Sequence, residues 1–101
     1  MTRQLDPAAF RPHIGTPFDL RLEDGNAIEL TLAGLTLYAP AGEEPVEKEG
    51  VRTPFSVYFT AKPLLPQGTY RIEHVAIGPL ELFLVPISVD PAGYRYEAVF
   101  N

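Results

Sequence analysis

A chain of 101 residues with 46% hydrophobic content is expected to form one domain with a core of its own. The formal net charge of −5 argues against a nucleic-acid-binding domain, because such domains usually gather a surplus of Lys and Arg on one face. The absence of cysteine excludes thiol catalysis, thiolate metal sites and disulfide bonds.

The first predicted element is a single helical turn over residues 6–12, DPAAFRP. Asp6 can cap this turn, and Pro7 suits the first helical position, where a missing N–H costs nothing. Pro12 prevents the helix from continuing.

Period-two alternation of apolar residues then predicts two strands, over residues 18–23 and 27–39. Asp24-Gly25 between them is a strong signal for a tight hairpin turn. In the second strand the apolar residues change from even to odd positions around Gly34. A β-bulge at Gly34 would restore the alternation and bend the strand. The alternative is that the strand ends there.

Residues 39–53 lose every periodic pattern and are rich in Pro, Gly and Glu, so we expect an exposed acidic loop. Strand patterns return after it and predict four further strands, joined by turn-rich segments: residues 54–61, 69–75, 80–89 and 94–100. Pro86 lies inside the third of these, and it must occupy an edge or a kink because it cannot donate a hydrogen bond to a ladder.

The fold class predicted from these elements is all-β. Six strands with mostly short connections favour antiparallel neighbours around one core. We therefore expect residues 1–101 to form a single domain, a small six-stranded and mainly antiparallel barrel or sandwich with one short N-terminal helical turn. A closed barrel would also remove the sheet edges that invite aggregation.

The sequence also allows a prediction of localisation. No stretch approaches the roughly 18 apolar residues that a membrane helix needs, and residues 1–10 lack the apolar run of a secretory signal. We expect no membrane insertion and a cytoplasmic protein as synthesised. Membership of an extracellular appendage or particle would require export without a cleaved signal.

The residues that could carry chemistry do not form a recognised motif. His13 and His74 are the only histidines, and without cysteine a zinc site would need both of them with a carboxylate. Ser56 and Ser88 do not lie in a nucleophile turn. We therefore predict no catalytic residues, no metal and no cofactor, and we expect each histidine to be satisfied by hydrogen bonds.

Acidic side chains on the predicted strands could in principle form a two-carboxylate glycosidase site. Arginines alternate on the same strands, so cross-strand ion pairs on an outer face are the better interpretation. The residues concerned are Glu29, Glu73, Glu81 and Glu97, with Arg21, Arg71 and Arg95.

Strand residues 55–60 and 80–89 carry large apolar side chains on both faces. A barrel needs only one buried face, so the surplus predicts a second buried surface at a contact with another protein or another copy. The aromatic residues could instead stack nucleic-acid bases, but the acidic balance opposes this. The candidate interaction surface consists of Tyr58, Tyr70, His74, Phe83, Tyr94, Tyr96 and Phe100.

Several segments resemble a family of small bacterial all-β domains of unknown function: PFSVYFTA, LPQGTYRIEHVAIGPLELFLVPI and the final YEAVFN, with Phe10, Gly15 and Phe18 spaced ahead of them. Members of that family are often encoded near phage-tail-collar-like proteins. The resemblance implies an accessory part of a tail, fibre or other extracellular appendage. It implies no activity and no site residues.

Three functional hypotheses follow. The first is a non-enzymatic structural domain that binds proteins, either self-associating as a homo-oligomer or docking on a larger tail- or fibre-like assembly. The alternative is a small-ligand or carbohydrate-binding barrel with His74, Tyr70, Tyr94 and Tyr96 in its mouth. An enzyme comes third, and it would require His13 and His74 to meet beside a carboxylate.

Overall fold

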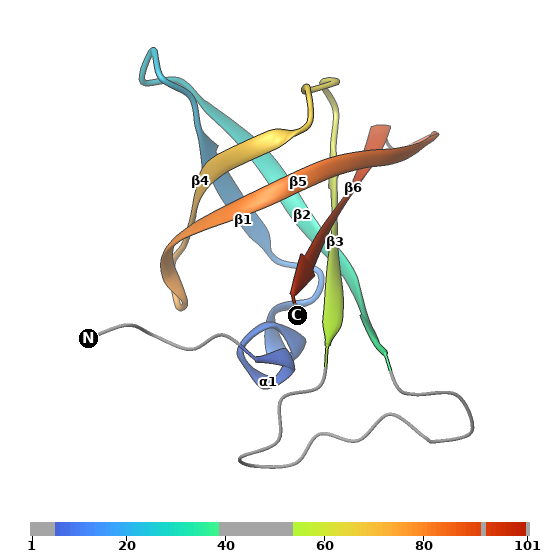
Figure 1. The fold of residues 1–101 in the computed structure, drawn as a ribbon. Helices are drawn as coiled ribbons and strands as arrows, with labels where there is room; N and C mark the ends of the chain where they lie inside the picture. Colours follow the sequence, from blue (N-terminus) through green and yellow to red (C-terminus); the bar gives the residue numbers. More distant parts are fainter. Residues whose placement is uncertain (1–5, 39–53, 92, 101) are drawn as a thin grey trace.

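The computed structural model describes residues 6–38, 54–91 and 93–100, apart from the side chain of Asp90. Figure 1 shows six strands closed into a barrel in the order β1-β2-β3-β6-β5-β4, and every neighbouring pair is antiparallel. The all-β prediction is confirmed, and the architecture is a barrel rather than a sandwich. The elements are α1 (Pro7–Phe10), the 3-10 helix η1 (Arg11–His13), β1 (Pro17–Arg21), β2 (Ala27–Leu37), β3 (Phe55–Ala61), β4 (Gly68–His74), β5 (Gly78–Asp90) and β6 (Gly93–Phe100).

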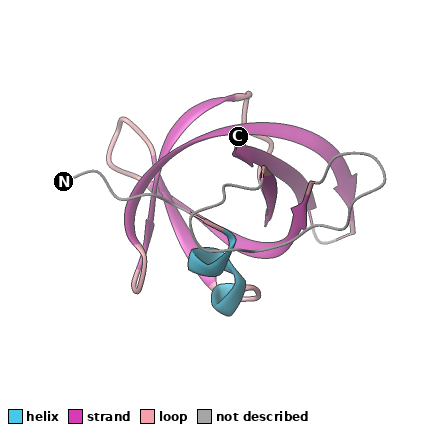
Figure 2. Cartoon of the chain, turned by 60° about the horizontal axis from the view of Figure 1, so that its bottom comes forward, coloured by secondary structure: helices cyan, strands magenta, loops and turns pink. Residues whose placement is uncertain are grey.

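The barrel consists of two three-stranded meanders, β1-β2-β3 and β4-β5-β6, joined where β1 pairs with β4 and β3 pairs with β6. Strands β3 and β4 lie on opposite walls, so the link between them, residues 62–67, crosses one end of the barrel. We call this the upper end, as in Figure 1. The lower end carries α1, η1 and the β4–β5 turn, and Figure 2 shows it turned toward the viewer.

Inward-facing side chains fill the barrel. They come from alternate positions of all six strands, as the period-two pattern predicts: Phe18, Leu20, Leu30, Leu32, Phe55, Val57, Phe59, Ala61, Ile72, His74, Leu80, Leu82, Leu84, Tyr96 and Ala98 are all buried. Eight strands leave an interior just wide enough for side chains, and six leave less. The interior is therefore a packed core.

Phe10 closes the lower end from outside the strands. Its ring lies 5.5 Å from that of Phe100 and 6.2 Å from that of Phe55, and the Phe55 and Phe100 rings stack at 4.6 Å. The predicted helical turn puts Phe10 there. Asp6 Oδ1 accepts a hydrogen bond of 3.0 Å from the backbone N–H of Ala9, and a proline occupies the first turn, as predicted.

Two bulges shape the sheet. The β2–β3 register shifts between Leu32 and Gly34 while β2 continues to Leu37, so the predicted bulge is confirmed. A second shift occurs on β5 between Pro86 and Ser88. There β5 has already left β4, so a proline without an N–H is tolerated.

The predicted acidic loop, residues 39–53, lies outside the described residues. In the described part of the chain, every helix is too short to span a bilayer.

Candidate functional site

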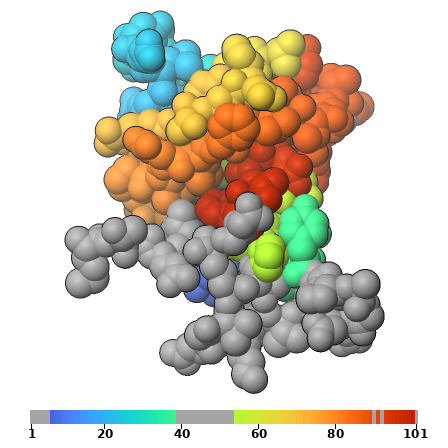
Figure 3. Space-filling view, viewed as in Figure 1, coloured from blue at the N-terminus to red at the C-terminus, as the bar shows by residue number. Residues whose placement is uncertain are grey.

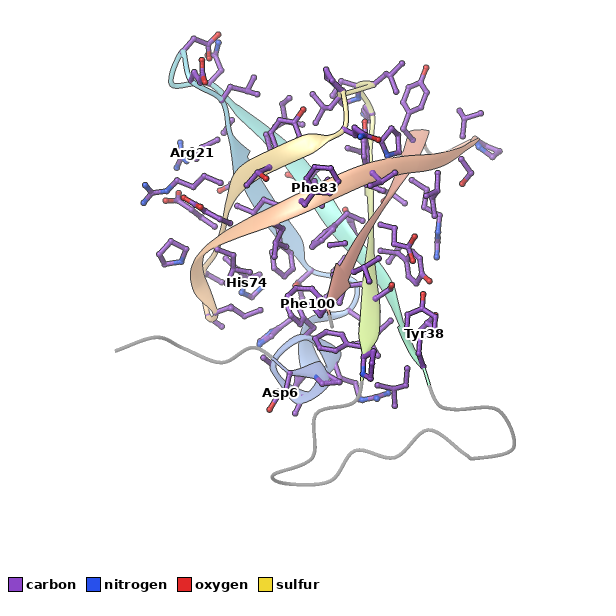
Figure 4. All side chains as sticks on the ribbon, viewed as in Figure 1. Asp6, Arg21, Tyr38, His74, Phe83 and Phe100 are labelled. Carbon is purple, nitrogen blue, oxygen red and sulfur yellow. The ribbon has the colours of Figure 1, made fainter. Side chains whose placement is uncertain are left out.

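The two histidines meet at the lower end of the barrel. The imidazole of His13, at the end of η1, lies 4.6 Å from that of His74, the last residue of β4. The ring of His74 also lies 4.2 Å from that of Phe18 on β1, and His74 is buried. Figure 4 shows His74 inside the lower part of the barrel.

The hydrogen bonds of His74 fix its neutral form. Its Nδ1 accepts from the backbone N–H groups of Ala76, at 3.0 Å, and Ile77, at 3.2 Å. A nitrogen that accepts cannot carry the proton, so the proton resides on Nε2. Nε2 lies 3.0 Å from Thr16 Oγ1 and donates to it, and the Thr16 hydroxyl in turn donates to the carbonyl oxygen of His13 at 2.6 Å.

This network does not favour nucleophilic chemistry at Thr16. A histidine that acts as a base must offer a lone pair to the hydroxyl, whereas His74 directs an N–H at Thr16. Burial, and after it the nearby His13 ring, lower the pKa of His74, which keeps the ring neutral. Among the described residues, no group of three or more His, Asp or Glu side chains could hold a metal ion. The cluster thus ties the β4–β5 turn to the start of β1.

A tyrosine does the corresponding work at the upper end. The side chain of Tyr96 is fully buried. Its hydroxyl accepts from the Leu65 N–H at 2.7 Å and donates to the Pro63 carbonyl oxygen at 2.8 Å. The hydroxyl of Tyr70 donates to the carbonyl oxygen of Pro66. Both hydroxyls therefore fasten the 62–67 link across the barrel.

The predicted ligand-binding mouth is not assembled. Tyr70 and His74 lie at opposite ends of β4, about 13 Å apart at roughly 3.3 Å per residue. Tyr70 and Tyr96 both bind the 62–67 link, and Tyr94 pairs with Ala61 just before it, so the three tyrosines belong to the upper end. His74 lies at the lower end, so the expectation of all four in one mouth is corrected.

The outer face of β1 and β4 is charged. Arg21 Nε lies 2.9 Å from Glu73 Oε1 across the β1–β4 seam, and Arg71 Nε lies 3.5 Å from Glu73 Oε2. The prediction of cross-strand ion pairs is confirmed here. Arg95 instead lies over the ring of Tyr58, 4.8 Å from its centroid.

The outer face of β5 and β6 differs, because exposed apolar side chains lie there beside Glu81 and Glu97. Phe83 is 51% exposed and Val99 is 54% exposed. Val85 pairs with Glu97, and the same register continued by two residues sets Phe83 opposite Val99. We call Phe83, Val85 and Val99 the apolar strip. Exposed Ile87 lies farther along β5, at the bulge. Figure 3 shows β5 crossing the front of the molecule above β6, and Figure 4 shows Phe83 on it.

The structure therefore divides the predicted interaction surface. Phe83 and Tyr58 lie on the outer face, Phe100 packs against Phe10 and Phe55, and Tyr70 and Tyr94 are partly buried. Tyr96 and His74 are buried and contribute to the interior, which corrects their assignment to a surface.

Sequence reasoning missed Val85 and Val99 because it followed aromatic residues. The alternating pattern does indicate that both residues face outward. Each residue has the opposite parity to the buried positions of its own strand.

A family model described as "Domain of unknown function (DUF6916)" matches residues 5–100. No curated protein and no solved structure gives a significant match.

Proposed function

The chain belongs to this family of domains of unknown function, and we propose that it is a non-enzymatic structural domain that binds protein through the outer face of β5 and β6. The carrying observation is the exposure of Phe83 and Val99 on neighbouring strands. Scattered exposed apolar residues are normal on any protein, but adjacent ones on one sheet face are typical of interaction sites.

The strip favours contact by side chains rather than by strand addition. Among the described residues, β5 pairs only with β6 from Val85 onward, so no described strand covers its other edge. Pro86 and the neighbouring bulge lie on this edge, and both features hinder the pairing of another strand. A partner would therefore cover the flat face around Phe83.

Within this proposal a second copy of the chain is the first partner to test. The net charge of −5 opposes contact between copies over most of the surface. An uncharged strip can face its own two-fold image without that repulsion. The resemblance to domains encoded near tail-collar-like proteins supports a tail- or fibre-like assembly as the setting in which such a contact would be used.

The ligand-binding alternative gains no support from the site. The interior is filled by the core side chains, and the hydroxyls of Tyr96 and Tyr70 are bound to the 62–67 link. A ligand that used these hydroxyls would first have to displace the link.

The experiment is light scattering with size-exclusion chromatography over a dilution series. We expect wild type to show a concentration-dependent mass above the monomer and Phe83→Glu to remain monomeric. Ala27→Glu is the matched control, because it adds the same charge at an exposed position of β2, where Ala27 pairs with Arg21 of β1 away from the apolar strip. This variant should associate as wild type does. A wild type that stays monomeric at all concentrations, or equal association of Phe83→Glu, would refute the proposal for self-association.

A further inference from the structure

We propose that the lower end of the barrel is an acid-sensitive latch, in which protonation of His74 separates the β4–β5 turn from the segment that leads into β1. This inference is independent of the proposed function. It rests on the position of one imidazole, which is hydrogen-bonded to both segments.

Both ring nitrogens of His74 are used. Nδ1 holds the turn through the N–H groups of Ala76 and Ile77, and Nε2 reaches Thr16, which is bonded to His13. A second proton can enter only at Nδ1, where it would face two N–H donors. Both turn bonds would then be lost.

Among the described residues, the groups seen to contact the ring carry no negative charge. On the N-terminal side they are Thr16, Phe18 and the His13 imidazole at 4.6 Å, and the turn contributes the N–H groups of Ala76 and Ile77. Within β4 the adjacent Glu73 lies on the outer face, paired with arginines. A protonated His13 would add like-charge repulsion.

The rest of the lower end does not depend on a proton. Phe10, Phe55 and Phe100 pack ring against ring, and β3 pairs with β6 from Phe55–Phe100 to Ala61–Tyr94. Gly15 and Thr16 stay bonded to the backbone of Leu32. We therefore expect opening to be confined to residues 75–77, with the barrel closed above them.

The sign follows from proton linkage. Burial lowers the pKa of His74 in the closed state, whereas in the open state the ring has an ordinary pKa of about 6.5. The open state therefore binds the proton more tightly, and opening becomes easier as pH falls below about 6.5. The opening constant should rise by up to about tenfold per pH unit until the closed-state pKa is reached.

Amide hydrogen exchange on the full chain at pH 7 and pH 5, corrected for intrinsic exchange rates, tests the latch. In wild type we expect protection at Ala76 and Ile77 to fall several-fold at pH 5, while protection in β3 and β6 is kept. His74→Asn is the control variant. Its side-chain oxygen can accept from the same turn amides but does not titrate, so its protection should not depend on pH.

Two results would overturn the latch. One is pH-independent protection in wild type or an equal response in His74→Asn. The other is loss of protection across β3 and β6 together with the turn. A second measurement needs only the wild-type protein. The ¹⁵N NMR spectrum of the imidazoles at pH 7 should show the proton of His74 on Nε2, and a proton on Nδ1 would contradict the mechanism.

Discussion

The two ends of the barrel are closed in the same way, but the side chains that close them differ in chemistry. At each end a connecting segment crosses the opening, and one inward side chain binds its backbone: Tyr96 holds the 62–67 link above, and His74 holds the β4–β5 turn below. A phenol keeps its proton over the physiological range, and burial raises the pKa of Tyr96 further from it.

An imidazole does not share this insensitivity, because its ordinary pKa of about 6.5 lies within that range. By this comparison we expect one end of the fold to be indifferent to pH and the other to respond to it. The lower end compensates with aromatic packing by Phe10, which the upper end lacks in the described residues.

The largest effect should come from removing that packing. Phe10→Ala deletes a fully buried ring that contacts Phe55 and Phe100, and we expect a loss of about 3–5 kcal/mol in the free energy of unfolding. Chemical denaturation monitored by circular dichroism measures it. Phe83→Ala removes an equally large but half-exposed ring and should cost much less; equal losses would contradict the assignment of Phe10 to the core.

At the upper end, Gly93 in the β5–β6 turn lies close to the backbone of Ala61 and Lys62. Gly93 has φ of +134°, and a Cβ there would overlap the carbonyl oxygen of Ala61 and lie 3.2 Å from Lys62 Cα. We expect Gly93→Ala to cost about 3 kcal/mol, since strain and overlap add. Gly68→Ala is the matched control, because its Cβ would meet its nearest atom at 3.9 Å. Denaturant midpoints that shift equally for the two variants would disprove this close approach.

Tyr96→Phe should have an intermediate effect. It keeps the ring in the core but leaves the Leu65 N–H and the Pro63 carbonyl without a partner, at a cost of about 1–3 kcal/mol. Hydrogen exchange should show the loss concentrated at residues 62–67. Unchanged protection of Leu65 would show that the hydroxyl does not hold the link.

Local patterns were sufficient for much of the fold. The change of parity around Gly34 predicted a bulge, and the Asp6-Pro7 pair predicted a helical turn, because both features depend on a few neighbouring residues. Phe83 was predicted on an outer face because it alternates with the buried Leu82 and Leu84.

The site was less predictable because it depends on closure. His13 and His74 meet only because β1 pairs with β4 through three residue pairs, Asp19–Glu73 to Arg21–Arg71, and no local pattern encodes that seam. The alternating pattern likewise predicted on which face of β6 Tyr96 lies, together with Tyr94 and Ala98. It could not say that the hydroxyl would bind the link between the two meanders.

The smallest effect should be the pH dependence of global stability, and it separates the two ends directly. The folded-state pKa of His74 is lowered, so its contribution is fully present above about pH 6.5 and is lost as pH falls through the folded-state pKa. Arg21 lowers the pKa of Glu73. The contribution of this carboxylate to the free energy of unfolding is therefore lost only below about pH 4.3. Between pH 6.5 and 5, wild type and Tyr96→Phe should therefore lose stability in parallel, whereas the denaturation midpoint of His74→Asn should change less. If the three slopes coincide, the acid response of the barrel does not arise at its lower end.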